Sequence, residues 1–150
     1  MSSAVTRASI EKGLRPLGLE PGDVVFVHSS LSSFGEVVGG ADTVIQAILN
    51  VIGPQGTLAV PTFNYQPDVW DPETTPSIVG AITERLRQRP GAARSLHPTH
   101  SVTAIGRGAR ELVAGHEELH SFARGTPLHR IYERGGKILL LKVAALHQAL

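Results

Sequence analysis

The sequence predicts an α/β domain with a mixed sheet and flanking helices, because short apolar runs alternate with segments of helical periodicity. The first apolar run is rich in β-branched residues and follows the turn Glu20-Pro21-Gly22, which predicts a buried strand over 24–28. Apolar residues then recur with helical spacing over 41–52, where Asp42 is the expected cap and Gly53-Pro54 ends the helix. Three more strands are predicted from the apolar runs at 57–62, 101–105 and 137–143.

A second helix is expected over 76–89, because Pro76 suits a first helical position and Pro90-Gly91 ends the pattern. Its apolar stripe consists of Ile78, Val79, Ile82 and Leu86. A chain of 150 residues, 41% of them hydrophobic, is large enough to bury a core of its own. We therefore expect residues 1–150 to form a single domain.

Two polar segments stand directly beside predicted strands. The first reads V-H-S-S-L-S-S-F-G over 27–35 and lies at the carboxyl end of a strand, where open α/β sheets bind their ligands. A turn capped by serines is the plainer interpretation. The second reads R-S-L-H-P-T-H-S over 94–101 and holds His97 and His100. Either histidine can be an ordinary polar residue at a strand start, and a metal pair lacks a neighbouring carboxylate or Cys to complete it.

Six separated motifs, read in order, resemble the aminoglycoside 3-N-acetyltransferase family. They are V-H-S-S-L-S-S-F-G, V-V-G-G-A-D, G-P-Q-G-T-L-A-V-P-T-F, D-P-E-T-T-P-S, R-S-L-H-P-T-H-S and G-G-K-I-L-L-L, and the likeness runs from about residue 12 to residue 141. The resemblance implies transfer of an acetyl group from acetyl-coenzyme A to the 3-amino group of a deoxystreptamine antibiotic. It makes acetyl-CoA and an aminoglycoside the expected partners, with antibiotic resistance as the outcome.

The resemblance also indicates the site residues. His97 matches the His of the family's R-S-x-H-P segment, and His147 matches the expected base of a Leu-His-x-x-Glu segment, although no Glu stands three residues later because the sequence ends at Leu150. An attacking amine needs a base with a pKa near 7, which His provides. The polar turn offers donors to an oxyanion. The expected acetyl-CoA contacts are His28, Ser29, Ser30, Ser32, Ser33 and Ser101.

An acidic loop is the expected wall for the acceptor. Asp68, Asp71 and Glu73 lie in a Pro-rich stretch beside Trp70, and a polyammonium sugar requires carboxylates. Asp71 and Glu73 are the substrate-binding candidates, with a merely solvated acidic loop as the alternative.

A competing motif points to a different chemistry. His116-Glu117-Glu118-Leu119-His120 fits H-E-x-x-H, which on a helix binds zinc and would indicate a zinc hydrolase. Gly115 precedes the motif and a polar stretch follows it, whereas a metalloprotease requires a long apolar helix there. We therefore expect a surface connection between two core elements, and no metal.

Composition limits the remaining classes. A net charge of +1 with dispersed arginines gives no electrostatic case for nucleic acid, and zero Cys excludes thiolate chemistry. No apolar stretch resembles a membrane span or a secretory signal, so we expect a cytoplasmic protein. Since the relatives are expected to continue, we interpret the chain as incomplete at its C-terminus, with an exposed sheet edge at 137–143 that favours self-association. A non-catalytic CoA-binding remnant, a divergent end and a genuine short form are the alternatives.

Overall fold

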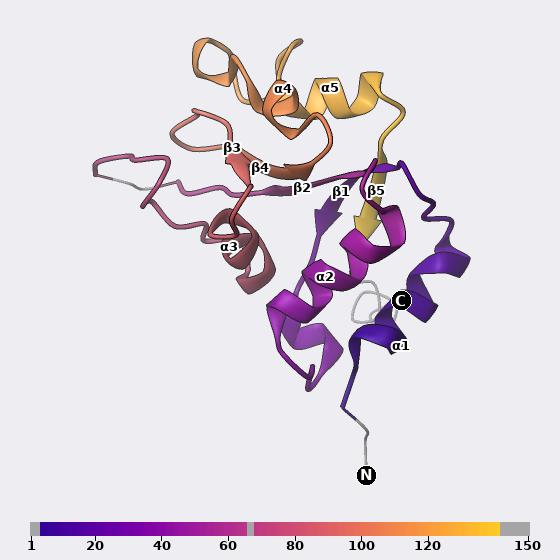
Figure 1. Cartoon of the computed structure of the whole chain (residues 1–150). Helices are drawn as coiled ribbons and strands as arrows, with labels where there is room; N and C mark the ends of the chain where they lie inside the picture. The colour runs from indigo at the N-terminus through magenta and orange to yellow at the C-terminus, as the bar shows by residue number, and fades with distance from the viewer. Residues whose placement is uncertain (1–3, 66–67, 142–150) are drawn as a thin grey trace, which may run out of the picture.

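The computed structural model describes residues 4–65 and 68–141, and within them it contains one five-stranded sheet covered by helices on both faces (Figure 1). The strands are β1 (Val24–His28), β2 (Thr57–Pro61), β3 (Ala93–Arg94), β4 (Val102–Gly106) and β5 (Lys137–Leu140). The helices are α1 (Arg7–Leu14), α2 (Ala41–Ile52), α3 (Ala81–Arg87), α4 (Ala109–Val113) and α5 (Pro127–Glu133). The expected α/β class is confirmed.

The sheet is mixed, as predicted. Its spatial order is β3-β4-β2-β1-β5, in which β1 pairs in parallel with both β2 and β5, while β4 pairs antiparallel with β2 and with β3. The sheet therefore changes from parallel to antiparallel between β2 and β4. This change brings the carboxyl end of β2 beside the beginning of β4.

Alternation along β1 divides the apolar residues between two cores. Val25 and Val27 face the core that α1, α2 and α3 cover, and Phe26 faces the opposite core, which α4 and α5 cover. All three side chains are at most 2% exposed. A strand that is buried on both faces has a continuous run of apolar residues, and this run allowed β1 to be predicted from the sequence.

Two details of the predicted helices are wrong. Asp42 does not cap α2, because the cap position is Gly40, whose φ of 65° favours glycine, and Asp42 instead lies in the first turn and pairs with Arg85 at 2.6 Å. The second helix begins at Ala81 rather than at residue 76. The residues before Ala81 are not helical, because the Ile78 amide donates to the carbonyl of Phe63, in the segment after β2. The Ile78 side chain is 57% exposed and does not belong to the apolar stripe.

Three helices and a strand were not expected from the sequence. α1 begins with a capping box between Thr6 and Ser9 and packs Ile10 and Leu14 into the first core. α4, α5 and β3 are short, and they complete the second core and one edge of the sheet.

The other edge of the sheet is β5, as anticipated. Ile138 is 68% exposed and Leu140 45% exposed on this strand. Positions 142–143 of the predicted strand lie outside the described residues. In the described part of the chain, no helix combines the length and apolar character needed to cross a membrane.

Candidate active site

Three polar segments lie at the end of the sheet where β1 and β2 finish and β4 begins: residues 29–35, the acidic loop 68–75, and the loop 95–101. Hydrogen bonds join the residues after β2 to the loop 95–101, because the Thr62 amide donates to the Ser101 carbonyl (2.9 Å) and the Asn64 amide donates to the Thr99 carbonyl (3.0 Å). The β2–β4 pairing thus continues past the strand ends. Segments more than 30 residues apart in the sequence are brought into one region.

The serine turn after β1 lines a groove of about 640 Å³. Ser29, Ser30 and Ser32 form one wall and Val79 to Ala81 form the other. The Ser30 and Ser32 hydroxyls bond each other at 3.0 Å, whereas the buried Ser29 Oγ has no hydrogen-bond partner among the described residues. Ser33 lies in the same 3₁₀ turn, Leu31–Phe34. An unpartnered buried hydroxyl beside a groove is suited to a ligand atom.

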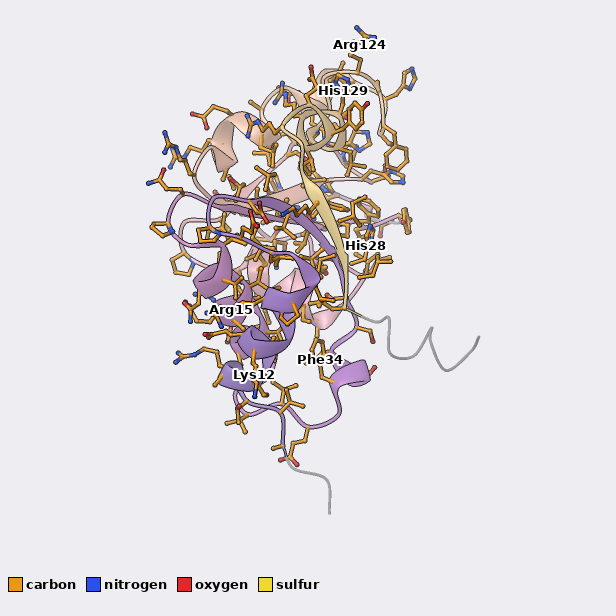
Figure 2. The ribbon with its side chains drawn as sticks, turned by 90° about the vertical axis from the view of Figure 1, so that its right-hand side faces the viewer. Lys12, Arg15, His28, Phe34, Arg124 and His129 are labelled. Carbon is orange, nitrogen blue, oxygen red and sulfur yellow. The ribbon has the colours of Figure 1, made fainter. Side chains whose placement is uncertain are left out.

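His28 lies apart from this groove. Its ring packs edge-on against Phe26 at 5.0 Å, so it is on the face opposite to Val27 and Ser29. Figure 2 shows it beside β5, where it pairs with Leu140, and far from Arg124 and His129. The sequence places His28 next to the serines, but strand alternation separates their side chains.

His97 is held by backbone donors. Its Nδ1 accepts hydrogen bonds from the amides of Thr99 (3.2 Å) and His100 (3.0 Å), so this nitrogen carries no proton and the neutral ring is protonated at Nε2. Burial, together with the nearby His100, lowers the pKa of His97. The ring is therefore kept neutral, with an Nε2–H that has no hydrogen-bond partner in the part of the chain that the structure describes, which makes it a hydrogen-bond donor rather than a proton acceptor.

His116 was the residue whose role sequence reasoning missed. It is 1% exposed, although a surface connection was expected here, and its ring packs on that of His97 with centroids 4.6 Å apart. Its Nδ1 bonds the Ser95 hydroxyl at 2.7 Å and its Nε2 lies 3.3 Å from the Ser121 carbonyl. Burial, reinforced by His97, lowers the pKa of His116.

These contacts remove the basis for a zinc site. The motif begins with a 3₁₀ turn, His116–Glu118, instead of lying within an α-helix, and the buried His116 ring is bonded to protein groups while His120 is exposed. Within residues 4–65 and 68–141, no three His, Cys, Asp or Glu side chains are grouped to hold a metal ion.

His100 forms a partly exposed aromatic cluster at the edge of the same region. Its ring lies 4.9 Å from Phe63, 5.3 Å from Tyr65 and 5.3 Å from Phe122. Its Nδ1 shares hydrogen bonds with the hydroxyls of Thr99 and Ser121. The arrangement fixes the His100 ring by contacts on several sides.

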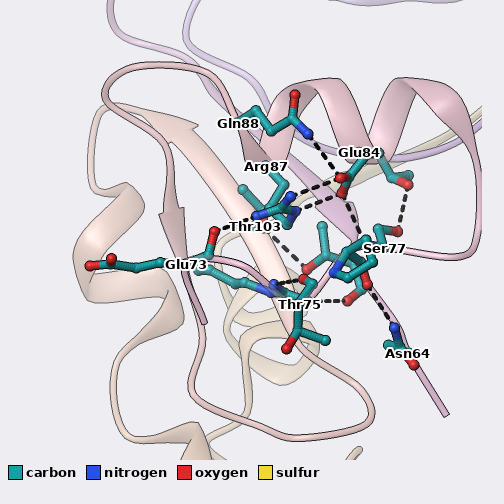
Figure 3. A network of polar contacts seen from close by, with 12 residues as sticks. Asn64, Glu73, Thr75, Ser77, Glu84, Arg87, Gln88 and Thr103 are labelled. Atoms are coloured by element: carbon teal, nitrogen blue, oxygen red, sulfur yellow. Dashed lines mark hydrogen bonds and ion pairs between the residues drawn. The ribbon is translucent and has the colours of Figure 1, made fainter. Parts of the chain in front are cut away.

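The acidic loop presents its carboxylates outward. Asp71 accepts the Glu73 amide on Oδ1 (2.8 Å), and its own amide donates to the Thr75 hydroxyl (2.8 Å), which makes a tight local turn. Glu73 is exposed, and Figure 3 shows its side chain pointing away from the polar network. Both candidate substrate carboxylates are therefore accessible to a cation.

Ser101 is part of a buried hydroxyl network. It is 1% exposed, donates to the Thr62 carbonyl (2.8 Å) and accepts from Arg94 Nε (2.9 Å). With both of its hydrogen-bonding functions used inside the protein, Ser101 supports its neighbours and is not oriented toward a cofactor.

Comparison with known proteins decides the family. The sequence profile described as aminoglycoside 3-N-acetyltransferase matches residues 26–148. The chain belongs to the aminoglycoside 3-N-acetyltransferase family. It is 36% identical to aminoglycoside N(3)-acetyltransferase III of Acinetobacter baumannii, over 96% of this chain and 59% of that protein. It is 38% identical to aminoglycoside N(3)-acetyltransferase IX of Micromonospora chalcea, over 91% of this chain and 57% of that protein.

Solved structures of the family have the same fold. The crystal structure of AAC(3)-Xa superposes with a TM-score of 0.88 at 38% identity, covering 93% of this chain and 56% of that one. AAC-IIIb, solved as a binary complex with CoASH, gives 0.86 at 31% identity over 92% of this chain and 59% of that one. AAC-VIa bound to sisomicin gives 0.85 at 29% identity, with coverages of 92% and 59%. The chain spans less than two thirds of the length of each acetyltransferase.

The family match extends through His147, but His147 lies outside the described residues. Its role as the base stays a prediction. The assignments of the serines, His97, Asp71 and Glu73 to cofactor, reaction and acceptor are likewise proposals.

Proposed function

We propose that this chain carries the acetyl-CoA and acceptor regions of an aminoglycoside 3-N-acetyltransferase. The observation that carries the proposal is that the serine turn, the acidic loop and the His97 loop all lie at one end of the sheet, in a chain of this family. Related structures bound to CoASH and to sisomicin support the two ligand classes.

In the proposed reaction, the acceptor's neutral 3-amino group attacks the thioester carbonyl carbon. An N–C bond forms and the carbonyl oxygen becomes an oxyanion, for which the neutral Nε2–H of His97 and donors in the serine turn are the candidate partners. The C–S bond then breaks, and the amine proton passes to a base and on to the leaving thiolate. His147 is the proposed base, because His97 has its free nitrogen protonated.

Binding of acetyl-CoA is tested by a measurement that does not require catalysis. Acetyl-CoA should raise the melting temperature of the protein, and replacing Ser30 and Ser32 together by Leu should abolish that shift because the groove would be filled. Lys12→Leu, an equally apolar change on the exposed surface of α1, is the matched control and should keep the shift. An unchanged shift in the double variant would remove the serine turn from the proposed site.

Turnover is tested by thiol release from acetyl-CoA with sisomicin as acceptor. We expect weak turnover, lost in His147→Ala and reduced about 100- to 1000-fold in His97→Ala, as for removal of one oxyanion donor. Acetyl-CoA binding with no thiol release from the unmodified chain would favour the non-catalytic CoA-binding remnant.

Self-association through β5 belongs to the same proposal, as does residence in the cytoplasm. The exposed Ile138 and Leu140 on an edge strand support pairing with a second strand. Light scattering after size-exclusion chromatography should show association that Ile138→Lys reduces. A monodisperse monomer for both proteins would contradict it.

A further inference from the structure

Arg94, on β3, is a half-buried cation without a carboxylate partner among the described residues. Its guanidinium donates instead to neutral oxygens: Nε to the Ser101 hydroxyl (2.9 Å), Nη2 to the Thr62 carbonyl (3.0 Å), and Nη1 to the carbonyls of Pro72 (3.2 Å) and Thr75. Burial, with a contribution from nearby Arg87, lowers the pKa of Arg94 to about 10. A buried charge held only by neutral oxygens is costly, so its placement calls for a function.

The four contacts join three different segments. Thr62 follows β2, Ser101 precedes β4, and Pro72 and Thr75 belong to the acidic loop. The guanidinium also lies over the ring of Trp70, 5.6 Å from its centroid. Arg94 thus fastens the second half of the acidic loop to the sheet through planar, divergent donors.

A second arginine holds the middle of the loop. Arg87 donates to the Glu73 carbonyl at 2.7 Å while it pairs with Glu84 at 2.6 Å (Figure 3). In all of the hydrogen bonds from these two arginines the loop contributes backbone oxygens. The carboxylates of Asp71 and Glu73 are therefore not used by either arginine and stay exposed.

We propose that Arg94 is a positioning residue of the acceptor site, which holds the acidic loop in the conformation that presents Asp71 and Glu73 to a polyammonium sugar. This inference rests on the proposed function. Ordering the loop in the free protein removes an entropic cost from the binding step, which strengthens binding without a direct contact. A lysine would keep the charge but cannot reach four divergent oxygens.

The experiment uses Trp70, the only tryptophan in the chain, as a reporter of the loop. In the protein without ligand, Arg94→Lys should increase acrylamide quenching of Trp70 fluorescence at least twofold. Titration with sisomicin, followed by the same fluorescence and by calorimetry, should give a dissociation constant at least 10-fold higher for Arg94→Lys. Arg85→Lys, the same change at an exposed salt bridge on α3, is the control and should change neither value.

Arg94→Met separates positioning from charge. Loss of a nearby positive charge would tighten binding of a polycation if electrostatics alone mattered, whereas the proposal predicts weaker binding. The melting-temperature shift by acetyl-CoA should be retained in the Arg94 variants and serves as the check of folding. If both variants fail to fold, Ser101→Ala, which removes one of the four acceptors of Arg94 together with the bond from the Ser101 hydroxyl to the Thr62 carbonyl, should weaken sisomicin binding at least threefold.

The outcomes distinguish the two proposals. If the unmodified chain binds sisomicin and folded Arg94→Lys binds it equally well, the Arg94 inference is wrong while the proposed function stands. Unchanged binding by Ser101→Ala, where the other variants do not fold, overturns it in the same way. If the unmodified chain does not bind sisomicin, the acceptor assignment and the Arg94 inference both fail.

Discussion

Removing the Ser95 hydroxyl should destabilise the protein strongly, although the hydroxyl is a small group. Ser95 is fully buried and its Oγ makes two hydrogen bonds, accepting from the Val102 amide at 2.8 Å and donating to His116 Nδ1 at 2.7 Å. Ser95→Ala leaves a buried N–H and a buried imidazole nitrogen unpaired, and each such group costs about 1–3 kcal/mol. Some relaxation is expected, so the free energy of unfolding should fall by about 2–4 kcal/mol in all.

Thermal and urea unfolding followed by circular dichroism measure this loss. For a chain of this size, about 2–4 °C per kcal/mol gives a decrease in melting temperature of roughly 5–15 °C. Ser30→Ala is the matched control, because among residues 4–65 and 68–141 the Ser30 hydroxyl bonds only the exposed Ser32 hydroxyl, and the change should cost at most about 0.5 kcal/mol. Equal losses for Ser95→Ala and Ser30→Ala would refute the reasoning.

Three further outcomes are expected. Because burial lowers the folded-state pKa of His116 below the unfolded value of about 6.5, the unfolded chain binds the proton more readily. Stability should therefore be complete above pH 6.5 and decrease as the pH falls below it, and a flat profile of melting temperature between pH 7.5 and 5 would contradict this. Gly106→Ala should destabilise the protein by several kcal/mol, since φ is +107° and a Cβ would meet the carbonyl oxygen of Gly56. Gly13→Ala in α1 places its Cβ in open space and should stabilise the protein by about 0.5–1 kcal/mol. The denaturant midpoints of the two variants measure these changes in stability. Purified protein should carry no stoichiometric zinc by elemental analysis, and one equivalent lost in His120→Ala would restore the hydrolase interpretation.

The sequence predicted elements whose signals are local and strong. α2 was found with its bounds because its apolar period runs without interruption between glycines, and β1 because it is buried on both faces. α5 begins with a local signal, a Thr126 cap followed by Pro127, but its seven residues present little apolar periodicity. β3 consists of two residues and exists only through pairing with β4, which no local pattern can reveal.

The candidate site was predicted in outline and not in its contacts. The serine turn, the acidic loop and His97 lie at one end of the sheet because of the order and direction of the strands, which the motifs implied only through the family resemblance. His116 was not recognised as a buried partner, because Gly115 precedes it, two glutamates follow it, and the hydroxyl that holds it comes from Ser95, 21 residues earlier. Likewise the sequence shows that Arg94 is present but gives no sign of the backbone oxygens that surround it.

The pairing of β1 with β5 has a consequence for synthesis. Val25 pairs with Lys137 and His28 with Leu140. About 110 further residues must therefore be synthesised after β1 before the edge of β1 that pairs with β5 can form its hydrogen bonds. At the usual 5–20 residues per second, that interval is roughly 6–20 s, compared with microseconds to milliseconds for local helix and hairpin formation. During translation the apolar strand Val24–His28 therefore exposes unpaired backbone groups along one edge, which can pair with another chain. A ribosome-associated chaperone that covers this edge should raise the yield of folded protein.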